Sequence, residues 1–472
     1  MGRPLSWSNL MCLRLQLLGL LPSINLFVEF TGPNGTLPDA MSAAHDQISQ
    51  AATYMMWNTY PRLRKTIHMV GQGDQFAAEF VDLDPRAHDS IVNTERVHGE
   101  AEFKSLLETL TNHEFKLDDV QWSVTIVIDE DQPRMWVVLS CSHAMMDMAG
   151  LVTAMDLLLS ACDPTFKFAV DARETPVLDI APDIGRWRGL PFLFSLLGRS
   201  LRVAVGKQTI WTGFGDRRGG IFQSIVGGAT PLRDAFASRV RVIKVDADSL
   251  TKLKRAVKRH GPVTITALLN GVLVESLHGI INRRNTYVVT NCMVDNRRYT
   301  DREDWKSDLD QYVSDSRITW STRDDTVWEI ARRVMKKSLT FKKCQSAVVW
   351  RSLLMKIAKV PDIIPETWVV DESKITMLSF GVSSMGAIDN RITVKSLALG
   401  DGRHATITSS GFTTGAMMPL MNIMTINNAP CITLNFRDYH LSSDHADDLV
   451  RAMEARLKHI VTHDYSHTAC EA

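Results

Sequence analysis

The sequence lacks an excess of charge of either sign. Its 472 residues contain 53 Lys and Arg against 53 Asp and Glu, which gives a formal net charge of zero at pH 7. A balanced chain has no overall attraction for nucleic acid, so any specificity must come from a local site. We therefore expect no nucleic-acid partner.

Paired cysteines are also lacking. The chain has an odd number of scattered cysteines, none in a CxxC pair: Cys12, Cys141, Cys162, Cys292, Cys344, Cys431 and Cys470. This usage excludes a disulfide framework or a zinc ribbon and favours reduced thiols in a cytoplasmic protein. His440, Asp444 and His445 do not form a metal-binding spacing without further ligands, so we expect no metal.

No apolar run is long enough to cross a membrane. The most apolar N-terminal stretch is interrupted by Arg14 and Pro22, and its run 15–21 is too short to span a bilayer. No small-residue cleavage site follows, so we expect neither a signal peptide nor a transmembrane helix. The opening MGRPLS matches a myristoylation pattern, which would give only marginal membrane binding. A cytoplasmic protein with optional peripheral membrane contact is predicted.

Sequence repeats are absent, and so are GxSxG, GxGxxG and GxxxxGK[ST]. These absences count against solenoids, serine-hydrolase elbows and the common nucleotide-binding folds. Strand-like and helix-like segments alternate irregularly instead. The predicted strands are 24–30, 122–128, 134–141, 238–246, 286–294, 375–384 and 432–439. The predicted helices are 38–56, 101–113, 249–259, 264–279, 325–339 and 443–461, with a further helical face at 151–159.

This pattern predicts an α/β (α+β) fold with two halves. The N-terminal subdomain would cover residues 1–190, and the C-terminal subdomain residues 236–472. The stretch 191–235 is rich in Gly and Arg and is predicted to be a crossover linker. Ligand sites commonly form between such halves, so we expect the functional site there.

One short stretch carries a candidate reacting group. The segment SCSHAMMDMAGL, residues 140–151, places His143 and Asp147 between the apolar strand 134–141 and the following helix. A histidine at a strand end projects beyond the sheet, and its pKa near neutrality lets it take a proton from a hydroxyl. Asp147 could orient the imidazole directly, or it could pair with a cation and fix the loop. In isolation this spacing is more often an ordinary polar strand end, so its surroundings have to decide.

Other motifs stand in a fixed order along nearly the whole chain. They are AATYMMWNTYPRLRKTI (51–67), FKLDDVQWSVTIV (115–127), VDNRRY (294–299) and FGVSSMGAID (380–389). With the HxxxD stretch, they resemble the CoA-dependent acyltransferase superfamily of condensation domains and chloramphenicol acetyltransferases. LDQYVSDSRITW (309–320) and VWEIARRVMKKSL (327–339) look most like its fungal alcohol O-acetyltransferase branch.

The sequence departs from the superfamily motifs at three positions. The first histidine of HHxxxDG is Ser142, and the asparagine of the SNxG motif is Ser384. The glycine after the aspartate is Met148, with Gly150 two residues later. The last change leaves the geometry of the loop open.

The resemblance implies two chloramphenicol-acetyltransferase-like subdomains, each a mixed sheet flanked by helices, with an active-site tunnel between them. It implies that His143 deprotonates an acceptor hydroxyl, which attacks the thioester of acyl-CoA without an acyl-enzyme. Asp147 matches a structural aspartate paired with an arginine, here Arg297, with Arg298 less favoured. The residues matching the channel motif, where a hydroxyl could hold the oxyanion, are Ser383, Ser384 and Gly386.

The expected activity is therefore acyl transfer from acetyl-CoA to a small or secondary-metabolite alcohol, by a monomer with no tightly bound cofactor. Lys252, Arg255 and Arg259 share one side of helix 249–259 and could pair with CoA phosphates, although such a run is more often a solvated face. Two alternatives stay open. The acceptor could be an amine or a lipid hydroxyl, as in wax ester or diacylglycerol synthesis, or the chain could be a catalytically silent binding protein.

Overall fold

The computed structural model describes most of the two predicted halves. It covers residues 3–17, 19, 21–33, 44–71, 75–83, 91–163, 165–168, 209–210, 237–281, 286–295, 297, 309, 313–321, 325–344, 380–399, 402–415, 418–438 and 441–466. The predicted linker 191–235 lies outside these residues apart from 209–210. Arg298 and the first five residues of the predicted strand 375–384 also lie outside them.

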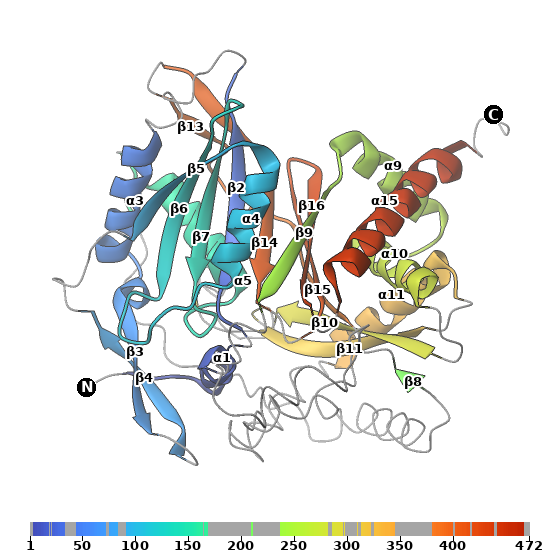
Figure 1. Ribbon diagram of the computed structural model, residues 1–472, viewed down its shortest axis with the longest axis horizontal. Helices are drawn as coiled ribbons and strands as arrows, with labels where there is room; N and C mark the ends of the chain where they lie inside the picture. Colours follow the sequence, from blue (N-terminus) through green and yellow to red (C-terminus); the bar gives the residue numbers. More distant parts are fainter. Residues whose placement is uncertain are drawn as a thin grey trace.

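The first sheet has six strands in the order β13-β14-β2-β7-β6-β5 and lies on the left of Figure 1. Its strands are antiparallel except for the parallel pair β5–β6. The bounds are β2 Ile24–Thr31, β5 Val92–Val97, β6 Trp122–Asp129, β7 Arg134–Cys141, β13 Ser396–Ala398 and β14 His404–Thr414.

Strand β7 is the buried centre of this sheet. Its apolar run alternates between two cores: Val137 and Leu139 pack on one face, while Trp136 and Val138 pack on the other. Helices α3 (Ala44–Asn58) and α5 (Met148–Ser160) contribute to the first core, and α4 (Gly99–Thr111) to the second. A strand covered on both faces needs such a continuous apolar run, which is how the sequence predicted it.

A small sheet and helix α1, both from the N-terminal part of the chain, lie at the lower end of the first sheet (Figure 1). The small sheet has three strands in the order β1-β4-β3. Helix α1 follows β1 and packs Leu13 into the first core. The bounds are β1 Arg3–Pro4, α1 Trp7–Leu17, the 3-10 turn η1 Pro61–Arg64, β3 Lys65–Gly71 and β4 Ala77–Asp82.

The second sheet is also mixed, with the order β11-β10-β12-β15-β16-β9 and β8 paired to β10. Its helices gather on one side, at the right of Figure 1, over a separate core. The strands are β8 Thr209–Ile210, β9 Ser238–Lys244, β10 Thr286–Asp295, β11 Val313–Ser321, β12 Phe380–Ala387, β15 Leu420–Ile426 and β16 Ala429–Arg437. The helices are α9 Ala247–Arg259, α10 Ile265–Ile280, α11 Val327–Cys344 and α15 Ser443–Ser466.

The predicted fold class is confirmed: two mixed sheets, each flanked by helices, account for the two halves. Every predicted strand and helix whose residues are described overlaps an observed element of the same type. The sequence division into 1–190 and 236–472 stays a prediction, but sheet membership does not follow it. Residues 396–414 belong to the C-terminal half in sequence, yet β13 and β14 join the first sheet through β2. The sequence predicted neither β13 nor β14, and local periodicity does not reveal a distant partner in a sheet.

Among the residues that the structure describes, no helix is both long enough and apolar enough to cross a bilayer.

Two glycines of α10 allow a matched test of packing in the second half. A Cβ on Gly271 would lie 2.5 Å from the carbonyl oxygen of Val327 at the start of α11, whereas a Cβ on Gly279 would meet nothing within 4 Å. We expect Gly271→Ala to lower the free energy of unfolding by roughly 1–3 kcal/mol, because α11 must shift. Gly279→Ala should raise it by up to about 1 kcal/mol through helix propensity. Urea unfolding of both variants measures this, and equal stability of the two would contradict the described packing.

Candidate functional site

His143 lies in the turn that joins the central strand β7 to helix α5. The turn is ordered by backbone hydrogen bonds: Ser142 N donates to Gln121 O at 2.9 Å, and Met145 N donates to Ser142 O at 2.9 Å. The helix starts at Met148. The half-buried imidazole therefore lies at the end of the strand, as the sequence predicted.

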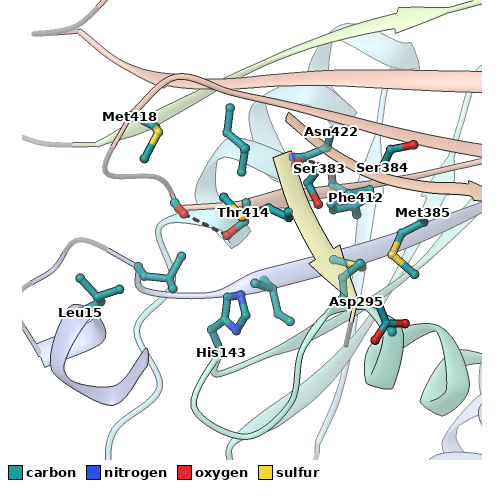
Figure 2. A pocket seen from close by; sticks show the side chains of 17 residues that line it. Leu15, His143, Asp295, Ser383, Ser384, Met385, Phe412, Thr414, Met418 and Asn422 are labelled. Atoms are coloured by element: carbon teal, nitrogen blue, oxygen red, sulfur yellow. Dashed lines mark hydrogen bonds between the residues drawn. The ribbon is translucent and has the colours of Figure 1, made fainter. Parts of the chain in front are cut away.

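A cavity of about 220 Å³ lies between the two sheets, and His143 lines it (Figure 2). Most of its lining is apolar and comes from both halves of the chain, from α1, β2, α5, β10, β12, β14 and β15. The polar side chains around it are few: His143, Asp295, Ser383, Ser384, Thr414 and Asn422. A concave, mostly apolar pocket with a few convergent polar groups is the usual form of a small-molecule site.

Burial controls the protonation of His143. Desolvation lowers its pKa, while a hydrogen bond to its own backbone and the nearby Asp147 carboxylate act in the opposite direction. The net result is a pKa below the ordinary value for histidine. The imidazole is therefore neutral at pH 7 and can accept a proton.

Asp147 caps helix α5 and forms an ion pair with Arg297. As the N-cap of α5, its Oδ1 accepts a hydrogen bond from Gly150 N at 2.9 Å. Its two carboxylate oxygens also accept from Arg297, Nη1 to Oδ2 at 2.7 Å and Nη2 to Oδ1 at 2.7 Å. Both side chains are buried, with 0% and 1% exposed. The sequence allowed two roles for Asp147: to orient the imidazole directly, or to pair with a cation and fix the loop. The structure shows the pairing, with Arg297.

The ion pair connects the two halves, because Arg297 follows strand β10 of the second sheet. Asp295, at the end of that strand, supports the arginine: Arg297 N donates to Asp295 Oδ1 at 3.0 Å, and Nη1 approaches the same oxygen at 3.3 Å. Asp295 also lines the cavity. Asp295 thus links the cavity wall to the ion pair between the halves.

A second arginine, which the sequence did not predict, also holds the start of α5. Arg391 Nη2 donates to Ala149 O at 2.7 Å and lies 3.3 Å from Thr153 Oγ1. Its pKa is lowered, mainly by burial and then by repulsion from nearby Arg297. The only feature of the sequence that pointed to Arg391 was its position just after the FGVSSMGAID motif. Local sequence patterns do not show that this position contacts α5.

The glycine missing from the HxxxD motif has a structural explanation. Met148 begins α5 directly after its N-cap, and its side chain lines the cavity. The close approach is two residues later, where a Cβ on Gly150 would lie 2.7 Å from Leu309 O. In this chain the glycine is needed at 150 for packing, and position 148 contributes a side chain to the cavity.

Of the three residues that match the channel motif, the two serines line the cavity, whereas the glycine shapes the backbone of β12. Ser383 and Ser384 of β12 line the cavity (Figure 2). Ser384 Oγ lies 3.0 Å from Thr266 Oγ1. Gly386 does not line the cavity. Its φ of +65° lies in the left-handed region at an irregularity in the pairing of β12 with β15, a conformation that favours glycine.

The basic residues of α9 lie away from the cavity. None of Lys252, Arg255 and Arg259 lines it, and Lys252 Nζ pairs with Asp248 on the same helix at 3.1 Å. A contact with CoA phosphates stays a prediction for these residues.

The sequence also missed that α1 belongs to this site. The segment before Pro22 was considered only as an apolar stretch too short to span a membrane, yet Asn9, Cys12 and Gln16 of α1 each contact the HxxxD loop. Their i, i+3, i+7 spacing is a helical face and was the available signal. From the other side, Arg62 Nε donates to Met145 O at 2.7 Å, so the PRLR motif also holds the loop.

Comparison with known proteins identifies the fold. No protein-family model and no curated protein matches this sequence. Among solved structures, trichothecene 15-O-acetyltransferase TRI3 from Fusarium sporotrichioides is similar with a TM-score of 0.69 and 12% identity, over 97% of this chain and 94% of that one. The first condensation domain of the CDA synthetase is similar with a TM-score of 0.64 and 12% identity, over 99% of this chain and 97% of that one. The epimerization domain from the third module of tyrocidine synthetase B is similar with a TM-score of 0.59 and 10% identity, over 98% of both chains.

These matches span nearly the whole chain and confirm the expected two-subdomain fold shared by condensation domains and this acetyltransferase. At such identities the likeness concerns the fold. The closer resemblance to fungal alcohol O-acetyltransferases stays a prediction.

The buried ion pair gives a test of stability. We expect Asp147→Asn to lower the free energy of unfolding by about 3–5 kcal/mol, because the buried guanidinium of Arg297 loses its fully buried carboxylate partner and keeps only the longer contact with Asp295. Asp248→Asn, which removes the exposed pair with Lys252, should change it by less than about 1 kcal/mol. Chemical denaturation of both variants measures this. Similar losses for the two would mean that the buried pair does not hold the halves.

Proposed function

We propose that this chain is an acyltransferase that moves an acyl group from acetyl-CoA to the hydroxyl of an apolar alcohol. The observation that carries this proposal is geometric: His143, at the end of β7, lines the same largely apolar cavity as Ser383 of the second sheet. The cavity lies between two sheets whose fold is shared with an enzyme named as an O-acetyltransferase. Acetyl-CoA acts here as a co-substrate, with no tightly bound cofactor.

The reaction needs one base and one oxyanion donor. His143 takes the proton of the acceptor hydroxyl as its oxygen attacks the thioester carbonyl. The resulting tetrahedral oxyanion accepts a hydrogen bond from the hydroxyl of Ser383. When the carbon–sulfur bond breaks, CoA leaves as a thiolate and takes the proton from the imidazolium. The products are an ester and free CoA, and His143 returns to its neutral state.

The lining of the cavity supports an apolar acceptor. Four methionines contribute to it: Met148, Met293, Met385 and Met418. Flexible thioether side chains adapt to ligands of different shape without adding a charge. Among the described residues of the lining, the carboxylate is that of Asp295, which is close to the Arg297 guanidinium. A charged acceptor would therefore find little compensation.

Replacing the base gives the direct test of this function. In an assay that follows release of free CoA thiol with a panel of alcohols and amines, we expect His143→Ala to reduce turnover by about 10²–10⁴-fold. His68→Ala removes an exposed histidine on β3 and should have no effect. Wild-type turnover in His143→Ala would refute the mechanism. Turnover of amines but not alcohols would refute the proposed acceptor class.

The lowered pKa of His143 predicts the pH dependence. Since the neutral imidazole is the active form, kcat/KM should fall only as pH drops below the ordinary histidine value, and it should stay level above it until other groups titrate. A pH profile with the lower limb centred above that value would contradict the effect of burial on the pKa of His143.

Met148 is expected to limit the size of the acceptor beside the reacting hydroxyl. We expect Met148→Ala to accept bulkier secondary alcohols while its rate with small primary alcohols changes little, because the lost side chain lies against the cavity. Met155→Ala is the matched control: it lies on the same helix, is fully buried and does not line the cavity. Relative rates over an acceptor series measure this. An unchanged order of preference in Met148→Ala would show that this side chain does not select the acceptor.

A further inference from the structure

Helix α1 contacts three consecutive residues of the HxxxD loop. Ser142 Oγ donates to Gln16 Oε1 at 2.6 Å, Cys12 Sγ lies 3.7 Å from His143 Nδ1, and Asn9 Nδ2 donates to Ala144 O at 2.8 Å. Figure 2 shows α1, marked by Leu15, beside the loop that carries His143. One face of the helix therefore meets the candidate base and both of its neighbours.

The orientation of the Gln16 amide is fixed by its chemistry. Its Nε2 donates to the carbonyl oxygen of Phe115 at 2.9 Å, and a carbonyl can only accept. Its Oε1 must then face Ser142, whose hydroxyl donates to it. Gln16 is buried, so both ends of the amide depend on these partners.

Asn9 is fixed in the same way at the start of the helix. Its side-chain oxygen accepts from the Ser6 hydroxyl, and its backbone N donates to Ser6 Oγ at 3.2 Å. Its Nδ2 is left to hold Ala144 O. The first turn of α1 is thereby fixed by the same residue that holds the loop.

Cys12 contacts the ring nitrogen that must carry the proton if Nε2 is to act as the base. A proton on Nδ1 can be donated both to the backbone of His143, an interaction that raises its pKa, and to the neighbouring thiol. Cys12 Sγ lies next to the same nitrogen, where it can act as a weak acceptor. The lone pair is then on Nε2, which a general base requires.

Helix α1 also reaches the cavity itself. Leu15, on the same helix, lines the cavity together with His143. Across the helix from the loop, Arg14 stacks over Phe76 at 5.3 Å and connects α1 to the β3–β4 region. The helix thus links the wall of the cavity to the loop that carries the base.

We propose that α1 is a positioning element of the acyl-transfer site. Asn9 and Gln16 hold the backbone around His143, and Cys12 keeps the proton on Nδ1 so that Nε2 stays available to the substrate. This inference rests on the proposed function for its kinetic consequences, but the tautomer of His143 can be measured without any turnover. Cys12, Asn9 and Gln16 are positioning residues, since each acts through His143 or its loop.

The decisive variant is Cys12→Val, which replaces the thiol by apolar methyl groups and removes the acceptor, compared with Cys12→Ser, which restores one. We expect Cys12→Val to lower kcat about fivefold with little change in KM, and to move the lower limb of the pH profile to lower pH, because the imidazolium loses a hydrogen-bond acceptor. Cys12→Ser should keep the wild-type profile. Arg14→Ala disturbs the opposite side of α1 and should also keep it.

Nitrogen NMR of histidine-labelled protein reads the tautomer directly, with the His143 signal assigned by its loss in His143→Ala. Wild type should show the Nδ1–H form, and Cys12→Val a mixture with the Nε2–H form. An unchanged tautomer and titration midpoint in Cys12→Val would overturn the inference. If the wild-type protein shows the Nδ1–H form but transfers no acyl group, the proposed function fails while the positioning role of α1 stands.

Discussion

The buried ion pair between Asp147 and Arg297 is the constraint on which the site depends. It caps helix α5, joins the loop after β7 to the end of β10, and brings the two sheets together around one cavity. A buried pair with two short hydrogen bonds is not in itself a large source of stability, since desolvation offsets most of the attraction. Its value here is geometric: with both charges buried, only one relative placement of the two loops leaves both of them paired.

The loop that carries His143 is held from several directions. Helix α1 contacts residues 142–144, Arg62 holds Met145, and Arg391 holds Ala149 at the start of α5. Each contact comes from a different part of the chain. Such a loop needs little rearrangement when a substrate binds. Preorganised donors and bases are what an enzyme requires for a reaction that develops charge in a largely apolar cavity.

The sequence predicted what depends on local patterns. The apolar run 134–141 indicated a strand covered on both faces, and β7 is one. The motif order indicated the fold and the pairing of Asp147 with Arg297, which the structure contains. Long-range relations were not predictable from the residues: the passage of β14 into the first sheet, the contact of Arg391 with α5, and the use of α1 to hold the loop. Met148 shows the same limit of sequence-based prediction at a single position. The motif showed only that a glycine is missing there, whereas the structure shows that the Met148 side chain lines the cavity.

The central claim is that one cavity holds donor and acceptor together while His143 transfers the proton between them. Initial rates measured while acetyl-CoA and an alcohol are varied together test it most directly, with intact-protein mass spectrometry of the enzyme and donor alone. Direct transfer predicts intersecting lines in the double-reciprocal plot and no acylated protein. Parallel lines together with a stable acetyl adduct on the protein would contradict it.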